Sequence, residues 1–246
     1  MWARRFIING SLAALSLSLI INIPAGDAYN FSVANNAPVS TPGGSRYAKE
    51  IGGKNYSLVA MSKAADCVLS VFGLLGELKP VQNISLIIEE DITTTATGVH
   101  NQTWAYVSNA SNIHVSARYL GGYKGADVKK EFTGIIYHSM ARVLPWDGKG
   151  QAPVGLLTGL ASFVRTYADL APAESTVQFG DGDRWDQGYE VTANFLIYCE
   201  SLREKFVPEL NLKMKDGYSN DFFYHLIGKT VDQLWKVYKT EFGQSY

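Results

Sequence analysis

Helical periodicity in the chain after Gly125 constrains the fold more than any other feature of this sequence. Over residues 126–143, apolar side chains recur at the spacing of one helix face, and Pro145 predicts where that helix ends. The apolar stripe consists of Phe132, Ile135, Ile136, Met140 and Val143. Similar patterns predict further helices over 155–168 and near 189–205, 220–227 and 231–242. The last of these opens with Thr230 and Gln233, the spacing of a capping box.

The first half of the chain combines one helix with strands. Residues 57–73 have helical spacing, and Ser40–Gly52 is predicted to be a turn-rich lead-in to that helix. Val81–Glu90 is rich in strand-forming residues, and Thr103–Ala117 predicts two strands around the turn-forming stretch SNASN. A β-containing first half followed by a mostly helical second half indicates an α+β fold.

The first 28 residues have the layout of a secretory signal peptide. Arg4 and Arg5 precede an uncharged apolar run over 12–23, which is too short to span a bilayer comfortably, and small residues follow it. We expect residues 1–28 to be removed, leaving one domain over 29–246. Removal takes away two arginines and one aspartate, so the formal net charge changes from −1 to −2. Such a near-neutral chain has no long-range attraction for nucleic acid or anionic membranes, and we expect neither as a partner.

Two further features fit a secreted glycoprotein. The Asn-x-Ser/Thr acceptor pattern for N-linked glycans occurs at Asn30, Asn55, Asn83, Asn101 and Asn109. Cys67 and Cys199 are the only cysteines. In an oxidising compartment they could form one disulfide, but both lie in apolar, helical contexts where a free buried thiol is equally ordinary.

Most of the chain, about 29–242, resembles the plant basic secretory proteins, a secreted, pathogenesis-related group classed with zinc-dependent peptidases. The stretches that carry the resemblance are STPGGSRYAKEIG, NIHVSARYLGGY, TGIIYH, GQAPVGLLTGLASFVR, GDRWDQGYEVTANFLIYCESL and TVDQLWKVYKTEF. The resemblance implies a zincin-like fold, with a small twisted sheet packed on helices in the N-terminal half and a mostly helical C-terminal half. It also implies a helix bearing His-Glu-x-x-His. On such a helix, two histidines share a zinc ion and the glutamate is the general base.

Matched to that pattern, this chain has lost most of the groups that the chemistry needs. His138 corresponds to the first histidine, Ser139 stands at the general base, and Arg142 stands at the second histidine. On the next helix, where the family pattern offers a glutamate and an aspartate four residues apart, the chain has Thr158 and Ser162. A guanidinium has no lone pair to donate and stays charged, so we expect no zinc, no other cofactor and no catalytic residue.

The same residues also have simpler interpretations. Arg142 could be a solvated or salt-bridging helix residue, with Glu131, Asp147 or Glu200 as its partner, or it could occupy the former metal cavity. Thr158 and Ser162, together with Arg165, could be the polar face of an amphipathic helix. Ser139 and His138 are not a nucleophile pair, because neighbours in a helix point about 100° apart.

The stretch DRWDQGYE, residues 183–190, concentrates large polar and aromatic groups. Trp185 and Tyr189 have the character of core anchors more often than of ligand contacts. If a cleft persists, we expect Trp146, Asp186 and Tyr189 around it.

The hypothesis that follows is a secreted, apoplastic, monomeric pseudoenzyme of the defence type, which binds a peptide, glycan or protein through a retained cleft. The alternative is an active secreted peptidase of the same family that uses a non-standard site.

Overall fold

The structure, a computed structural model, describes residues 29–73, 78–92 and 104–243. The predicted signal peptide over 1–28 and the acceptor site at Asn101 therefore lie outside the described residues.

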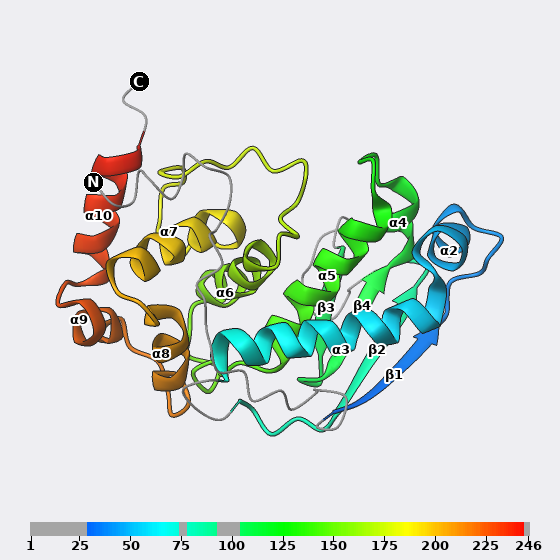
Figure 1. Ribbon diagram of the computed structural model, residues 1–246, viewed down its shortest axis with the longest axis horizontal. Coiled ribbons are helices and arrows are strands. Elements are labelled where there is room, and N and C mark those ends of the chain that lie inside the picture. The colour runs from blue at the N-terminus through cyan, green and yellow to red at the C-terminus, as the bar shows by residue number, and fades with distance from the viewer. Residues whose placement is uncertain (1–28, 74–77, 93–103, 244–246) are drawn as a thin grey trace.

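A mixed sheet of four strands, with the order β1-β2-β4-β3, forms one side of the described molecule (Figure 1). The strands are β1 (Asn30–Asn35), β2 (Asn83–Glu89), β3 (Ala105–Ser108) and β4 (Asn112–Ser116). Strand β2 is parallel to both of its neighbours, β1 and β4, and β3 is antiparallel to β4. The last three strands confirm the sequence prediction. Strand β1 was not predicted, because its sequence NFSVAN holds only Phe31 and Val33 as large apolar residues.

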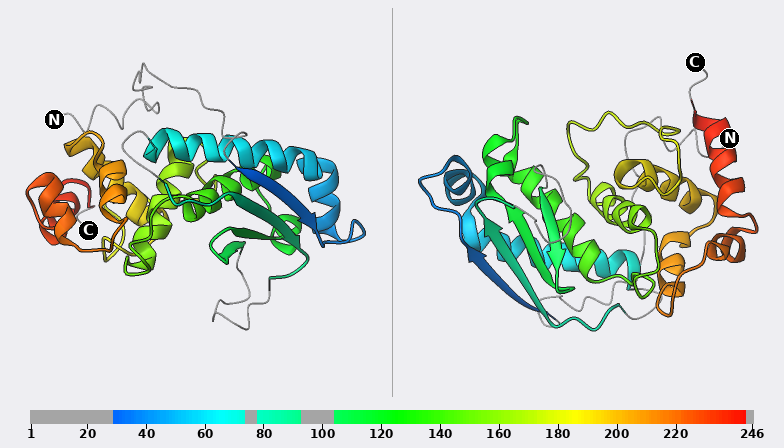
Figure 2. Two further views of the ribbon diagram at one scale, coloured as in Figure 1. Left: turned by 90° about the horizontal axis from the view of Figure 1, so that it is seen from below. Right: turned by 180° about the vertical axis from the view of Figure 1, so that it is seen from behind.

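Two long helices, α3 (Gly53–Phe72) and α5 (Val128–Val143), lie beside the sheet and against each other (Figures 1 and 2). Helix α3 connects β1 to β2 and contacts β1, whereas α5 contacts β3. The predicted stripe of α5 is confirmed, because all five of its residues are buried. On one face of the sheet, five apolar side chains are fully buried in the core: Ile84, Leu86, Ile88, Ile113 and Val115.

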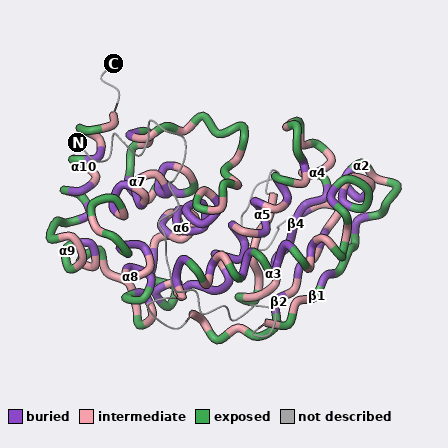
Figure 3. Tube along the Cα trace, in the orientation of Figure 1, coloured by how far each residue is buried: buried purple, intermediate pink, exposed green. Residues whose placement is uncertain are grey.

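The other side of the molecule is helical (Figure 1). Its helices are α6 (Val154–Tyr167), α7 (Tyr189–Leu202), α8 (Phe206–Lys213), α9 (Asp221–Ile227) and α10 (Val231–Phe242). Helix α6 packs between α5 and α7, so it joins the two sides through a continuous buried core (Figure 3). The approach of α7 to α6 is close at Gly159, where an added Cβ would collide with the side chain of Thr192.

The predicted helix boundaries hold with one exception in this half. The helix expected near 189–205 ends at Leu202, and the unpredicted helix α8 begins at Phe206. The Glu200 carboxylate accepts hydrogen bonds from the backbone N–H groups of Lys205 and Val207, at 2.6 and 2.8 Å, and so caps the start of α8. The predicted capping box of α10 is present.

The predicted turn-rich lead-in over Ser40–Gly52 is wrong, because most of it is helical. Helix α2 (Pro42–Arg46) continues into a π-helical turn over 47–51, and the Thr41 hydroxyl caps its start. Helix α2 packs on α4 (Ala117–Gly122), with Gly43 so close to the Ala117 carbonyl that a Cβ would collide with it. The glycines that suggested a turn are thus required by a contact between two helix backbones.

These elements confirm the α+β class. Among the described residues, no helix combines the length and apolar character needed to cross a bilayer. The four described acceptor asparagines, Asn30, Asn55, Asn83 and Asn109, are all exposed.

Cys67 on α3 and Cys199 on α7 are free thiols, so of the two interpretations left open by the sequence, the structure has the unbridged one. Burial raises the pKa of the Cys67 thiol to about 11, and it raises that of Cys199 further.

Candidate functional site

His138 lies near the middle of α5 and is only 5% exposed. The Trp104 ring meets the imidazole edge-on, with the ring centres 4.9 Å apart, and the Tyr189 ring stacks on it at 5.8 Å. These two aromatic residues come from the start of β3 and the start of α7, far from α5 in the sequence. Aromatic packing of this kind holds the imidazole in place and limits the access of solvent to it.

The His138 ring has one hydrogen-bond partner among the described side chains. Ser162 on α6 places its hydroxyl oxygen 3.5 Å from Nδ1, at the long end of hydrogen-bonding distance. Burial lowers the pKa of His138 to about 3, and the positive charges of Arg142 and Arg165 add to this effect. The imidazole is therefore neutral at physiological pH.

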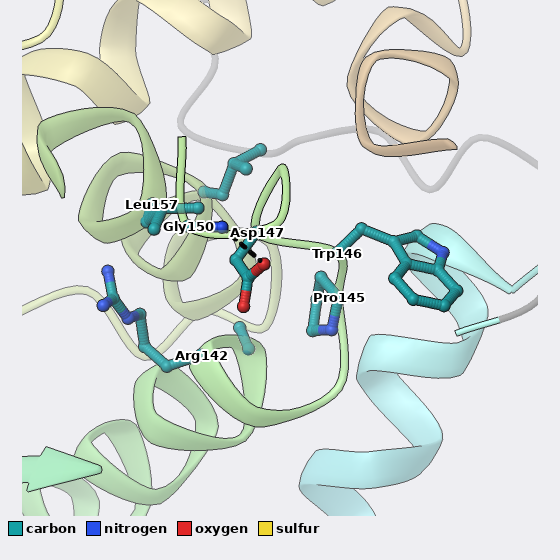
Figure 4. A pocket seen from close by; sticks show the side chains of 8 residues that line it. Arg142, Pro145, Trp146, Asp147, Gly150 and Leu157 are labelled. Carbon is teal, nitrogen blue, oxygen red and sulfur yellow. Dashed lines mark hydrogen bonds between the residues drawn. The ribbon is translucent and has the colours of Figure 1, made fainter. Parts of the chain in front are cut away.

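Arg142 stands one helical turn after His138 and faces a cavity of about 130 Å³ (Figure 4). The cavity lies where α5 turns into α6. Its lining consists of Ala141, Arg142, Pro145, Trp146, Asp147, Gly150, Leu157 and Leu160. The guanidinium nitrogen Nη1 is buried and has no hydrogen-bond partner in the described part of the chain.

The three carboxylates expected to pair with Arg142 are bound elsewhere, and this corrects the sequence interpretation. Glu131 binds Arg165 at 2.6 Å, and Glu200 caps α8. Asp147 binds the Lys79 ammonium at 3.3 Å and accepts a hydrogen bond from the Gly150 N–H (Figure 4). Burial lowers the pKa of Arg142, while Tyr189 and Asp147 raise it, and a guanidinium remains charged under all ordinary conditions.

The polar side of α6 does not face solvent as its pattern suggested. Ser162 and Arg165 are buried. The Arg165–Glu131 pair, 5% and 6% exposed, ties α6 to α5, and the Tyr119 hydroxyl donates to the same carboxylate at 2.9 Å. Partners on neighbouring elements therefore explain these polar residues.

Thr158 and Ser139, the other two positions of the altered motif, serve local structure. The Thr158 hydroxyl donates to the carbonyls of Val154 and Gly155 and accepts from the Tyr189 N–H at 3.3 Å. It thus fixes the start of α7 against α6. Ser139 is buried in the helix packing, and no hydrogen bond joins it to His138 among the described side chains.

The expected cleft residues fall into different environments. Tyr189 is 47% exposed and stacks on His138, and Trp146 lines the cavity beside Arg142. Asp186 pairs instead with Arg184 at 2.9 Å and does not line that cavity. Trp185 is a core anchor, as its residue type suggested, because it is buried against Phe223. Trp104 was missed, since nothing in its local sequence distinguishes it from an ordinary strand residue.

The donors around His138 do not fit a zinc ion. Catalytic zinc takes three protein ligands from imidazole, thiolate or carboxylate groups. Here the neighbours of the single imidazole are a hydroxyl, two aromatic rings and a cation. Nowhere in the ranges that the structure describes do three His, Cys, Asp or Glu side chains gather closely enough to hold a metal.

A second polar cluster, absent from the sequence expectations, lies on the outer face of the sheet. The Ser108 hydroxyl is 2.9 Å from Nε2 of His114, and Nδ1 of His114 is 2.9 Å from the Glu89 carboxylate. The Tyr106 ring stacks flat on the imidazole at 4.3 Å. The residues come from β3, β4 and β2, and cross-strand geometry brings them together.

Comparisons with known proteins show the family of the chain. This chain has an α+β fold with a histidine-bearing helix beside its sheet. It belongs to the family described as "Peptidase of plants and bacteria" (BSP), whose model matches residues 27–238. A particular relative is a "Basic secretory protease" of Boswellia serrata. It is 42% identical to this chain over 59 residues, which cover 24% of this chain and 67% of that protein. No solved structure matches the chain, so the zincin-like architecture stays a prediction.

Proposed function

We propose that this chain is a secreted, glycosylated family member that has lost its peptidase chemistry and acts in the apoplast by binding. Its partner would be a peptide, glycan or protein, held near His138, Tyr189 and Arg142, with a role in defence. The name of the Boswellia relative and the lack of a membrane-spanning helix in the described residues are compatible with secretion. The family resemblance alone supports the defence role.

One observation carries the loss of activity: a cation occupies the position where the second zinc ligand belongs. Arg142 cannot donate an electron pair, and its fixed charge repels a divalent ion. The carboxylates that could have neutralised it are bound to other groups. Ser139 cannot act as a carboxylate base, a role worth roughly 10²–10⁴-fold in rate.

The binding role follows from what remains at the surface. Tyr189 is 47% exposed and stacks on the buried His138, and a cavity lined by Arg142 and Trp146 lies at the α5–α6 turn. An aromatic ring in a cavity wall, as Trp146 provides, is typical of ligand sites.

The decisive experiment is a metal analysis and a cleavage assay on the purified secreted chain. We expect less than about 0.1 zinc per chain and no cleavage of an unfolded protein substrate, because His138 is the only strong donor that the described residues place at the site. The matched variant carries Ser139→Glu, Arg142→His, Thr158→Glu and Ser162→Asp. We expect zinc uptake only in that variant. One zinc per wild-type chain, or cleavage by it, would reject the proposal.

A second candidate function is a serine hydrolase, and the Ser108–His114–Glu89 hydrogen-bond chain favours it. A nucleophile, a base and a group that orients the base stand in that order. The Ser108 oxygen would bond to an acyl carbon while its proton moves to His114 Nε2 and then to the leaving group. Water would release the acid. A fluorophosphonate probe tests this: labelling that Ser108→Ala abolishes supports the hydrolase, whereas no labelling removes this candidate.

A further inference from the structure

The Arg142 guanidinium has a buried hydrogen-bond donor, Nη1, that is unsatisfied in the described part of the chain. Such donors are rare in native proteins. Leaving a buried donor unpaired costs about 1–3 kcal/mol, and more for a charged group. An unpaired buried group in a native structure calls for an explanation, such as a bound water or ion that satisfies the guanidinium.

Among the described residues, no carboxylate pairs with the Arg142 guanidinium at the cavity. Asp147 is the carboxylate in the lining, and Lys79 already neutralises it at 3.3 Å. His138 adds no charge, because burial keeps its imidazole neutral. Arg142, Lys79 and Asp147 therefore sum to a single positive charge. The Lys215 ammonium lies close by, over the Trp146 ring at 5.6 Å, so an anion is the favoured occupant.

The rest of the lining selects the kind of anion. Leu157, Leu160 and Pro145 give the cavity apolar walls. Figure 4 shows two of them, Leu157 and Pro145, around the same cavity as Arg142. A volume of about 130 Å³ is several times the ≈ 30 Å³ of one liquid water, so a small functional group with an apolar neighbour can enter. A carboxylate matches a guanidinium with two parallel hydrogen bonds, and in a peptide it has an apolar neighbour that the walls can contact.

From these observations, we infer that the cavity is a subsite for the carboxylate of a peptide, with the adjoining apolar side chain against Leu157 and Pro145. The carboxylate is the C-terminal one or that of an acidic side chain. The inference rests on the proposed binding function and specifies its ligand. It concerns the arginine of this chain, at a position where the family pattern has a histidine.

Three acetylated tetrapeptides separate the sources of the carboxylate by isothermal titration calorimetry on the full secreted chain. The first ends in leucine with a free carboxylate, the second is its C-terminal amide, and the third is an amide with glutamate in place of the leucine. We expect the free acid to bind about ten-fold more tightly than its amide, as one lost charge-assisted pair predicts. If the glutamate amide binds as well as the free acid, the side-chain source is supported.

Arg142→Met should erase the preference for the acid. Arg118→Met is the matched control, since it removes another arginine, 69% exposed and paired with Asp91, and should leave the preference intact. If Arg142→Met fails to fold, Arg142→Lys keeps the charge but loses the two-pronged geometry and should reduce the preference several-fold.

Equal affinity for all three peptides, no binding of any of them up to about 1 mM, or a preference that survives both Arg142 variants would overturn the subsite. Stoichiometric zinc or substrate cleavage would instead overturn the proposed function, whichever peptides bind. If peptides bind without an acid preference and no zinc is present, only the subsite fails.

Discussion

The neutral, buried state of His138 predicts a specific loss of stability in acid. The pKa of this side chain is about 3 in the folded protein, against 6.5 for an unperturbed histidine. Between these values the unfolded chain takes up a proton that the folded chain excludes. The free energy of unfolding therefore falls as the pH drops below 6.5 and is unaffected by this group at higher pH.

The size of the effect follows from the same two values. At about pH 5, the unfolded histidine is almost fully protonated and the folded one is not, which corresponds to a loss of roughly 2 kcal/mol. At pH 3 the loss is about 4 kcal/mol, because half of the folded histidines are then protonated too. Because His138 is only 5% exposed, solvent screening reduces these figures little.

His138→Phe removes the titration and keeps a ring between Trp104 and Tyr189. Urea unfolding of wild type and variant at about pH 7.5 and pH 5 gives the comparison. We expect the variant to lose roughly 2 kcal/mol less than the wild type between the two pH values. His225→Gln, at an exposed histidine of α9, controls for general acid effects. If wild type and His138→Phe lose the same stability, the reasoning about the buried imidazole is refuted.

Further predictions concern the packing and the thiols. Glu131→Gln should destabilise the fold by about 3–5 kcal/mol in urea unfolding, because it leaves Arg165 buried without its counter-charge; a loss below about 1 kcal/mol would show that the pair contributes little. Gly159→Ala should cost about 1–3 kcal/mol by forcing α6 away from α7, and an unchanged melting temperature would contradict this close approach. Cys67 and Cys199 should both react with a thiol reagent after denaturation without reductant, whereas a protein with no reactive thiol would contain the disulfide.

Periodicity predicted the helices well because their buried faces are long and regular. The stripe of α5 and the capping box of α10 are local patterns, and both are present. The short elements were missed for the opposite reason. Helix α2 contains two adjacent glycines that indicate a turn, and only its contact with α4 explains them. Strand β1 likewise depends on β2, its parallel neighbour, rather than on its own composition.

At the candidate site, the sequence identified positions but not partners. The altered motif placed His138 and Arg142 on one helix, and the structure agrees. The distribution of charge could not be foreseen, because the packing of α6 on α5, and not the order of the sequence, brings Arg165 to Glu131. Trp104 and the Ser108–His114–Glu89 chain depend on strand register, which separate segments determine together.

The corner formed by α2 and α4 has a consequence for the order in which the protein opens and closes. Each helix is far shorter than the length at which an isolated helix is stable in water, so neither persists alone. Arg46 binds the carbonyls of Leu120 and Tyr123, 74 and 77 residues further along the chain. The two helices should therefore exchange their amide hydrogens at a common rate, faster than α5. A protease should therefore reach both helices together, after this corner has unfolded locally and while the central core is still intact.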